Sequence, residues 1–163
     1  MEPQFETVVT KLIARAFVVA TFDPTGIEEA KRTVPVCFSS EEPVYEESLK
    51  ANLILDHSPG SCDTSRLEGG PVFLAHDDTN PDNQVAVAEG VTISSDRKGR
   101  AIARFSKSKR ADQIFQDVRD GIRRNVSVRA KLHKLVLEKV ENGLKTLRAV
   151  SWMPVEFSFV GLG

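Results

Sequence analysis

Ser127 is the residue whose type and setting first suggest covalent chemistry. It lies in the stretch GIRRNVSVRAKL (121–132), between two valines and close to several arginines, in a run typical of a β-strand. A serine hydroxyl attacks a carbonyl carbon only when a base removes its proton, and that base is usually a histidine. The histidines of the chain are His57, His76 and His133. Ser127 is therefore either an ordinary strand residue or a nucleophile served by one of these three.

The three histidines differ in how well they could serve Ser127. His133 follows Ser127 by six residues, which is roughly 20 Å along an unbroken strand, so we expect a solvated strand residue. His76 follows the apolar run PVFLA, and His57 lies at the end of LILD in the same way. Each of these two comes at the end of a predicted strand, where a ring could reach a cleft, and periodicity does not separate them.

A catalytic triad also needs a group that orients the imidazole and stabilises its charged form. In PVEFSFV (154–160) the apolar residues alternate with Glu156 and Ser158. Glu156 is therefore a candidate, although the same pattern fits the polar face of an edge strand. Asp77 is a weaker candidate because it is adjacent to His76, and neighbouring side chains of a strand point to opposite faces.

Most of the chain is predicted to form the strands that would position these residues. Short apolar runs are separated by turn signals, and they are ARAFVVATF (14–22), RTVPVCF (32–38), PVYEE (43–47), ANLILDH (51–57), PVFLAHD (71–77), QVAVAEGVTIS (84–94), GRAIARFS (99–106), RNVSVRAKLHKLVLE (124–138), LKTLRAVSW (144–152) and PVEFSFV (154–160). The ENG at 141–143 is typical of a hairpin connection.

One segment, SKSKRADQIFQDVRDGI (106–122), has helical rather than strand periodicity. Its apolar residues recur at helical spacing, and they are Ala111, Ile114, Phe115, Val118 and Ile122. Ser106 or Ser108 could cap the start, and Gly121 lies where a helix would end. The sequence thus predicts a mainly β chain with α (α+β), a barrel or sandwich with one amphipathic helix at about 107–121 that leads into the Ser127 strand.

Length and composition predict one soluble globular domain over residues 1–163. Hydrophobic residues make up 40% and charged residues 28%, and the formal net charge is −1. That balance indicates neither nucleic acid nor an anionic membrane as a partner. Glu2 and Glu6 argue against a secretory signal, and the apolar run 16–22 is too short to span a bilayer.

The remaining motif searches narrow the chemistry. Cys37 and Cys62 lack CxxC spacing, so we expect no metal, and two thiols without a signal fit a reducing cytoplasm. The sequence has no G-x-S-x-G, no H-E-x-x-H and no glycine-rich phosphate loop. We expect no cofactor. If the chain is an enzyme, a serine with a histidine is the constellation that remains.

Four stretches, taken in order, resemble the prohead proteases of tailed bacteriophages. They are CFSSEEPV (37–44), LILDHSPGSCDTSRLEGGPVFLAHD (53–77), GRAIARFSKSKRADQIFQDVRDGIRRNVSV (99–128) and SWMPVEFSFV (151–160). The resemblance implies a serine endopeptidase with a β-barrel flanked by helices, similar to the herpesvirus assembly proteases. It also implies cleavage of scaffold or major capsid protein segments, and of itself, inside the procapsid in the host cytoplasm, and it makes a homo-oligomer plausible.

Carried over position by position, the resemblance implies Ser127 as nucleophile, His76 as base in preference to His57, and Glu156 as the acidic residue. The family usually has glycine two residues after the serine, where this chain has Arg129, and Gln-Ile-Gly where this chain has Gln84, Val85 and Ala86.

A serine nucleophile also needs hydrogen-bond donors for the negatively charged oxygen of its tetrahedral intermediate. The candidates near Ser127 are the backbone N–H of Val128 and the side chains of Arg123, Arg124 and Arg129. The two arginines that precede the strand also fit a solvated charge cluster. Arg129 supports an alternative from another class, a non-catalytic scaffold or capsid-binding assembly module on the same fold, and a serine esterase for small molecules is a further alternative.

Overall fold

The computed structural model describes residues 7–9, 13–19 and 24–161, and it describes side chains from residue 25 to residue 161. The predicted strand at 14–22 lies partly outside these residues, and the acidic residues Glu2 and Glu6 lie wholly outside them. Within the described ranges, no helix is long and apolar enough to cross a membrane.

The described chain is mainly β with one α-helix, so the α+β prediction is confirmed. The strands are β1 (Thr7–Val9), β2 (Ile13–Val19), β3 (Thr33–Ser39), β4 (Val44–Glu46), β5 (Ala51–Leu55), β6 (Pro71–Leu74), β7 (Ala86–Ile93), β8 (Gly99–Phe105), β9 (Asn125–Glu141) and β10 (Leu144–Val160). The helix is α1 (Lys109–Arg119), and two 3₁₀ turns are η1 (Pro24–Gly26) and η2 (Pro81–Asn83).

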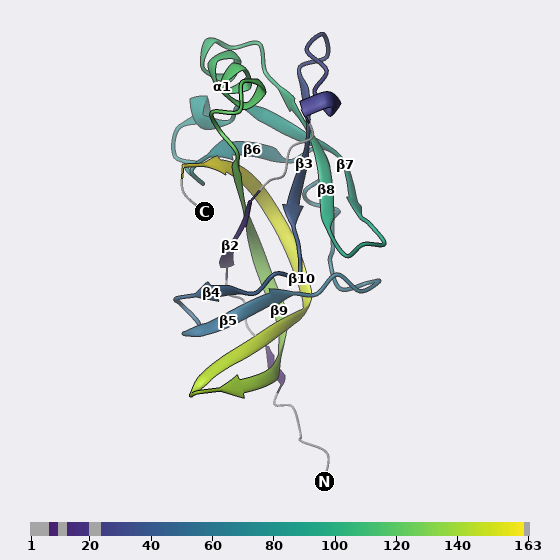
Figure 1. The fold of residues 1–163 in the computed structure, drawn as a ribbon, viewed down its shortest axis with the longest axis vertical. Helices are drawn as coiled ribbons and strands as arrows, with labels where there is room; N and C mark the ends of the chain where they lie inside the picture. The colour runs from purple at the N-terminus through teal and green to yellow at the C-terminus, as the bar shows by residue number, and fades with distance from the viewer. Residues whose placement is uncertain (1–6, 10–12, 20–23, 162–163) are drawn as a thin grey trace.

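The strands form one curved sheet, a half-barrel, around the long hairpin of β9 and β10 (Figure 1). Its order is β1-β9-β10-β6-β7-β8-β3, with β2 also on β9, and with β5 on β10 and β4 beyond it. The predicted ENG connection is confirmed, since Asn142 and Gly143 have φ of 51° and 78°, as a two-residue type I′ turn requires. The expected barrel flanked by several helices is met only in part, because the described residues hold a half-barrel and a single α-helix.

The helix packs on one end of the half-barrel, where Arg32 contacts its first turn and its middle. Ser108 caps its start by accepting the Ala111 N–H, and its apolar face is buried. The Arg32 guanidinium donates to Asp112 at 2.7 Å and lies 5.2 Å from the centre of the Phe115 ring, a charge-assisted and cation–π contact. These contacts fix the direction in which the chain leaves α1 toward β9.

One residue of the predicted helical stripe does not belong to it. The helix ends at Arg119, and Gly121 turns the chain with φ of +74°, a conformation that glycine adopts without steric cost. Ile122 therefore lies beyond the helix and is 73% exposed, so the prediction that it continues the apolar stripe was wrong.

The two predicted runs at 144–152 and 154–160 form one continuous strand, β10. Pro154, which donates no ladder hydrogen bond, lies at a register shift between Pro154 and Glu156. Such irregularities bend a strand and re-aim its side chains. The edge-strand interpretation of Glu156 is wrong, because here β10 lies between β9 and β6, and Glu156 is 1% exposed.

Candidate active site

The register of the central hairpin brings four polar side chains together. Ser127 on β9 is directly opposite Ser158 on β10, and Arg129 is directly opposite Glu156. Because residues two apart on a strand share a face, each strand contributes two neighbouring positions to the same patch. Directly opposite side chains begin about 5 Å apart, so the patch is a compact site in the middle of the sheet.

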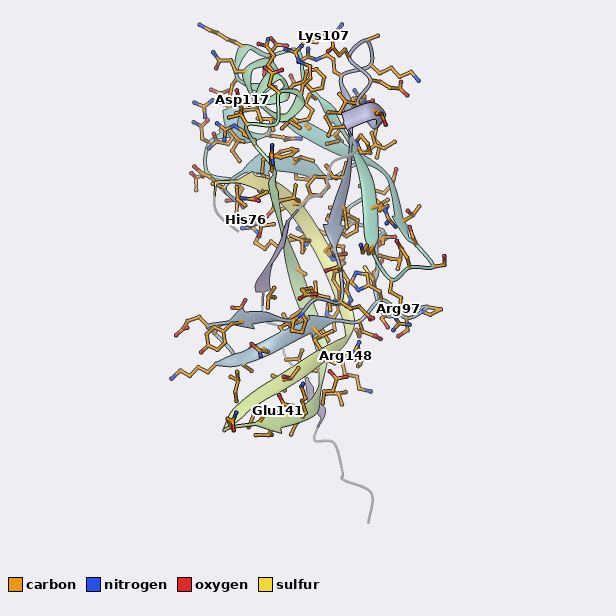
Figure 2. The ribbon with its side chains drawn as sticks, in the orientation of Figure 1. His76, Arg97, Lys107, Asp117, Glu141 and Arg148 are labelled. Atoms are coloured by element: carbon orange, nitrogen blue, oxygen red, sulfur yellow. The ribbon has the colours of Figure 1, made fainter. Side chains whose placement is uncertain are left out.

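His76 reaches this patch from the end of β6, which pairs with β10 on the side away from β9. The Ala75 N–H still donates to the Phe159 carbonyl at 3.0 Å, after which Ala75 and His76 both take left-handed backbone conformations, with φ of 51° and 57°. Such a conformation costs a non-glycine residue roughly 1 kcal/mol. The turn carries the imidazole across β10 toward β9, and Figure 2 shows His76 in the upper part of the molecule, far from Glu141 at the hairpin tip.

The structure brings Ser127, His76 and Glu156 into one hydrogen-bonded chain. His76 Nδ1 pairs with the Glu156 carboxylate at Oε1, and His76 Nε2 lies 2.8 Å from Ser127 Oγ. A carboxylate accepts and does not donate, which assigns the imidazole proton to Nδ1 and leaves Nε2 to accept the serine proton. Ser127 is 0%, His76 6% and Glu156 1% exposed. This is the arrangement in which a histidine could activate a serine hydroxyl.

Ser158 contributes a role that the sequence analysis did not assign. Its hydroxyl donates to Glu156 Oε2 at 2.8 Å and accepts the backbone N–H of His76 at 3.0 Å. One buried hydroxyl thus holds the second carboxylate oxygen and the strained turn that carries the imidazole. The available signal was the alternation in PVEFSFV, which places Glu156 and Ser158 on one face of the strand.

The candidate oxyanion donors occupy several different places. Arg123 Nε donates to Asp117 at 3.1 Å, and Arg124 Nε donates to the Gly121 carbonyl at 2.9 Å, so both guanidinium groups are engaged around the end of α1. Val128 is buried in a stretch of β9 that is paired with β10 on one side and β2 on the other. These three stay predictions as oxyanion donors.

Arg129 lies at the acid end of the hydrogen-bonded chain rather than at the serine end. Its Nε is 3.5 Å from Glu156 Oε1, and its Nη2 is 3.2 Å from Asp78 Oδ2. The guanidinium therefore contacts the acidic residue and the turn that follows His76.

The other two histidines are placed elsewhere. His133 is exposed on β9, as expected. His57 forms a second buried pair with a serine, its Nε2 being 2.8 Å from Ser39 Oγ, but its Nδ1 donates to the Leu55 carbonyl at 2.7 Å. A neutral carbonyl stabilises an imidazolium less than a carboxylate does, so the His57 pair is the weaker base–nucleophile arrangement.

A network of charges next to His57 ties the segment after β5 to the rest of the sheet. Asp56 accepts from Arg97 at 3.2 Å and from Arg148 at 3.1 Å, and both arginines lie in the lower half of Figure 2. Burial disfavours the Asp56 charge, but hydrogen bonds from Ser58 and Ser61, together with Arg148, outweigh it and hold the pKa of Asp56 at about 2. These contacts hold the segment after β5 against Arg97 and against Arg148 of β10.

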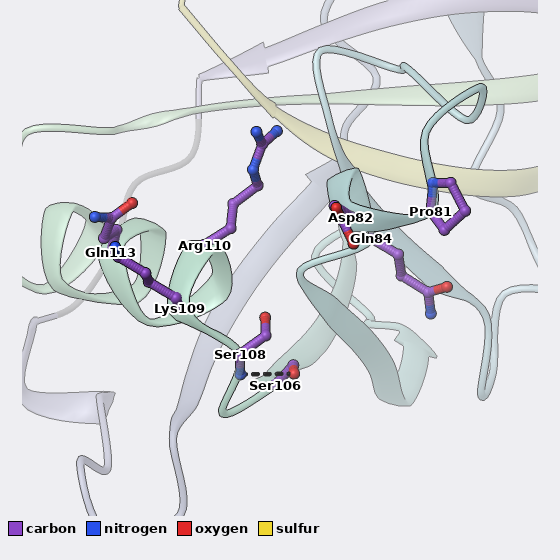
Figure 3. A pocket seen from close by; sticks show the side chains of 8 residues that line it. All are labelled: Pro81, Asp82, Gln84, Ser106, Ser108, Lys109, Arg110 and Gln113. Atoms are coloured by element: carbon purple, nitrogen blue, oxygen red, sulfur yellow. Dashed lines mark hydrogen bonds between the residues drawn. The ribbon is translucent and has the colours of Figure 1, made fainter.

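An open polar cavity of about 560 Å³ lies between η2 and the start of α1 (Figure 3). One wall is formed by the segment that follows His76, with Pro81, Asp82 and Gln84, and the opposite wall includes Lys109 and Gln113. The two walls are joined where Arg110 donates to Asn83. The cavity thus borders the segment that carries the candidate base. In the described part of the chain, no three His, Cys, Asp or Glu side chains converge as metal ligands would.

The fold is similar to that of a phage capsid assembly protease, as the resemblance to prohead proteases predicts. The solved structure of the bacteriophage T4 capsid assembly protease resembles it with a TM-score of 0.52, over 100% of both chains, at 12% sequence identity. At that identity the likeness is one of fold.

A second relative comes from the curated proteins. A protein named major capsid protein, from Halomonas phage phiHAP-1, is 44% identical to this chain over 110 residues. The match covers 67% of this chain and 18% of the relative, so the chain spans about a fifth of that relative's length. No family model matches the chain.

Proposed function

We propose that the chain is a serine endopeptidase of phage procapsid maturation, a single domain over residues 1–163 related to the herpesvirus assembly proteases. The observation that carries the proposal is the unbroken chain of contacts from Glu156 through His76 to Ser127, with Nε2 at 2.8 Å from the serine oxygen. The fold likeness to a capsid assembly protease supports it independently of those three side chains.

The reaction is acyl transfer in two halves. Ser127 Oγ bonds to the scissile carbonyl carbon while its proton passes to His76 Nε2, and Glu156 holds the resulting imidazolium at Nδ1. The tetrahedral intermediate collapses by breaking the C–N bond, and Nε2 returns the proton to the leaving amine. Water then attacks the acyl-enzyme by the same route, and Ser127 is regenerated.

The negative oxygen of the intermediate needs donors, and removal of one such donor typically costs about 3 kcal/mol of transition-state stabilisation. Val128 through its backbone N–H, and Arg123 or Arg124 through a side chain, are the candidates within a few residues of Ser127. The contact of Arg124 at the end of α1 is exposed, whereas that of Arg123 with Asp117 is partly buried. Arg124 could therefore turn toward a bound substrate without uncovering a buried charge, while the same turn of Arg123 would break its partly buried pair.

The proposed substrates are segments of the major capsid protein or of a scaffold protein, together with the chain itself. Both comparisons support a capsid-related partner, one through a protein named a capsid assembly protease and one through a protein named a major capsid protein. The reaction is then placed inside the procapsid, in the host cytoplasm, and self-association of the protease belongs to the same proposal.

The proposal predicts that Ser127 reacts with a fluorophosphonate, which phosphonylates only an activated serine. Intact mass spectrometry of the wild type, alone and mixed with the capsid protein, should show one added label that is absent from Ser127→Ala. Matched unfolding curves would show that the variant is folded. A label of equal amount in both proteins would contradict the assignment of Ser127.

A second candidate function is a non-catalytic assembly module. It is favoured by the identity of 44% to a segment of a protein named major capsid protein and by the complete burial of Ser127. It predicts that the wild type stays unlabelled both alone and with the capsid protein, while binding that protein as tightly as Ser127→Ala does.

A further inference from the structure

We propose that Arg129 is a positioning residue, which holds Glu156 and the turn after His76 in the arrangement needed for catalysis. The inference rests on the proposed function and adds a charged fourth member to its site. Arg129 occupies a position at which the prohead proteases that the sequence resembles usually have glycine.

The buried carboxylate of Glu156 needs a compensating charge. Its Oε1 accepts from His76 and its Oε2 accepts from Ser158, whose hydroxyl carries no charge. Burying an ionised carboxylate is costly unless a cation pairs with it. Arg129, itself only 19% exposed in its side chain, supplies that cation 3.5 Å from Oε1.

The contact between Arg129 and Glu156 is electrostatic rather than a hydrogen bond. A separation of 3.5 Å is too long for one, and Arg129 Nε is a buried donor without a hydrogen-bond partner. Arg129 therefore leaves Oε1 to His76. It stabilises the carboxylate without competing for the oxygen that orients the imidazole.

The other end of the guanidinium fixes the turn that carries the base. Arg129 Nη2 donates to Asp78 Oδ2 at 3.2 Å, two residues beyond the strained His76. One side chain thus joins the nucleophile's strand β9, the acid on β10 and the turn after β6. Loss of this clamp would leave the left-handed turn to relax and would weaken the orientation of the imidazole.

The test compares Arg129→Met, which keeps length and loses charge, with Arg129→Lys, which keeps charge. Arg104→Met is the control, because Arg104 on β8 makes an exposed ion pair with Glu89 on β7, outside the candidate active site. Two signals are measured in each protein, the NMR resonance of the hydrogen-bonded His76 Nδ1–H and the rate of fluorophosphonate labelling. Urea unfolding shows that each variant is folded.

Arg129→Met should shift or broaden the imidazole resonance and slow labelling about tenfold, the loss typical when a group that orients a functional residue is removed. Arg129→Lys should recover most of both signals, and Arg104→Met should change neither. An imidazole resonance and a labelling rate in Arg129→Met equal to those of the wild type would overturn the inference. If Arg129→Met does not fold, Asp78→Ala decides, since it removes the exposed carboxylate to which Arg129 donates, and wild-type values in that variant would equally overturn the inference.

Failure of the proposed function gives a different pattern. A wild type that is never labelled would reject the peptidase, while the NMR signal would still report whether Arg129 orients the His76–Glu156 pair. Normal labelling of both the wild type and Arg129→Met would reject only the role of Arg129.

Discussion

At the scale of single residues, the buried hydroxyl of Ser158 connects the acid to the base. It donates to Glu156 Oε2 and accepts the His76 N–H, so it restrains the carboxylate and the left-handed turn at the same time. A hydroxyl in this position contributes both to stability and to the geometry of the site. These two contributions are separable by experiment.

Ser158→Ala should lower the free energy of unfolding by about 1–3 kcal/mol, because it leaves a buried acceptor and a buried N–H without their partner. It should also slow labelling of Ser127 about tenfold, since the Glu156 carboxylate and the turn that carries the imidazole both lose a restraint. The matched control is Ser61→Ala, which removes a buried hydroxyl that donates to Asp56 at 2.6 Å, outside the candidate active site. Equal labelling rates in the two variants, at similar losses of stability, would contradict a positioning role for Ser158.

The site residues that the sequence predicts are those whose placement depends on neighbouring residues in the chain. Ser127, Glu156 and the end-of-strand histidines could be selected from residue type and period-two alternation. The choice between His57 and His76 could not, because both follow apolar runs whose strands pair with β10. His76 is the one that reaches Glu156, because β6 pairs with the Phe157–Phe159 stretch of β10, whereas β5 pairs farther along that strand at Thr146–Ala149. The contact of Arg129 with Glu156 lies far from the turn of the long hairpin and depends on the register shifts between them, the last at Pro154, which no local pattern encodes.

At the scale of elements, the helix and the hairpin turn were predictable because each is set by nearby residues. Ser108 and Gly121 bound α1, and Asn142 and Gly143 form the turn. The continuity of β10 through Pro154 was not predictable, since proline normally interrupts a central strand and is accommodated here at a register shift. Neighbouring residues thus determine where the helix and the turn begin and end. The continuity of β10 depends instead on its pairing with β9 and β6.

His57, in the segment that follows β5, makes the free energy of unfolding depend on pH. Burial lowers the pKa of His57 below its ordinary value of 6.5, although the Leu55 carbonyl and the Glu41 carboxylate favour the charged ring. Between the lowered and the ordinary pKa, the unfolded chain binds more protons than the folded chain. The contribution of His57 to stability is therefore complete above pH 6.5 and is lost as the pH falls below that value.

Urea unfolding at about pH 7.5 and about pH 5.5 tests this contribution. The free energy of unfolding of the wild type should fall more steeply with acid than that of His57→Asn, which cannot titrate in this range. An NMR titration of the folded wild type should place the pKa of His57 below 6.5. Equal slopes in the two proteins, or a pKa of His57 above that value, would contradict the assignment.

At the scale of the whole molecule, the long hairpin of β9 and β10 runs through the half-barrel (Figure 1). It carries four of the five interacting side chains, Ser127, Arg129, Glu156 and Ser158, and only His76 comes from outside it. The fold therefore places the site where the sheet is most densely paired, between β9, β10 and the end of β6. A site in this position has a rigid frame, and Ser127 within it is fully buried. Labelling of Ser127 therefore requires that the serine be uncovered, either by motion of the free chain or by a bound segment.

The central claim is that the chain cleaves a capsid or scaffold protein through Ser127, and intact mass spectrometry tests it most directly. The wild type and Ser127→Ala would each be produced together with the capsid protein encoded beside it, under conditions in which procapsids assemble. The account predicts new termini in the wild-type sample alone, with two fragments whose masses sum to the precursor plus one water. Identical masses in both samples, with both proteins folded and procapsids formed, would contradict it.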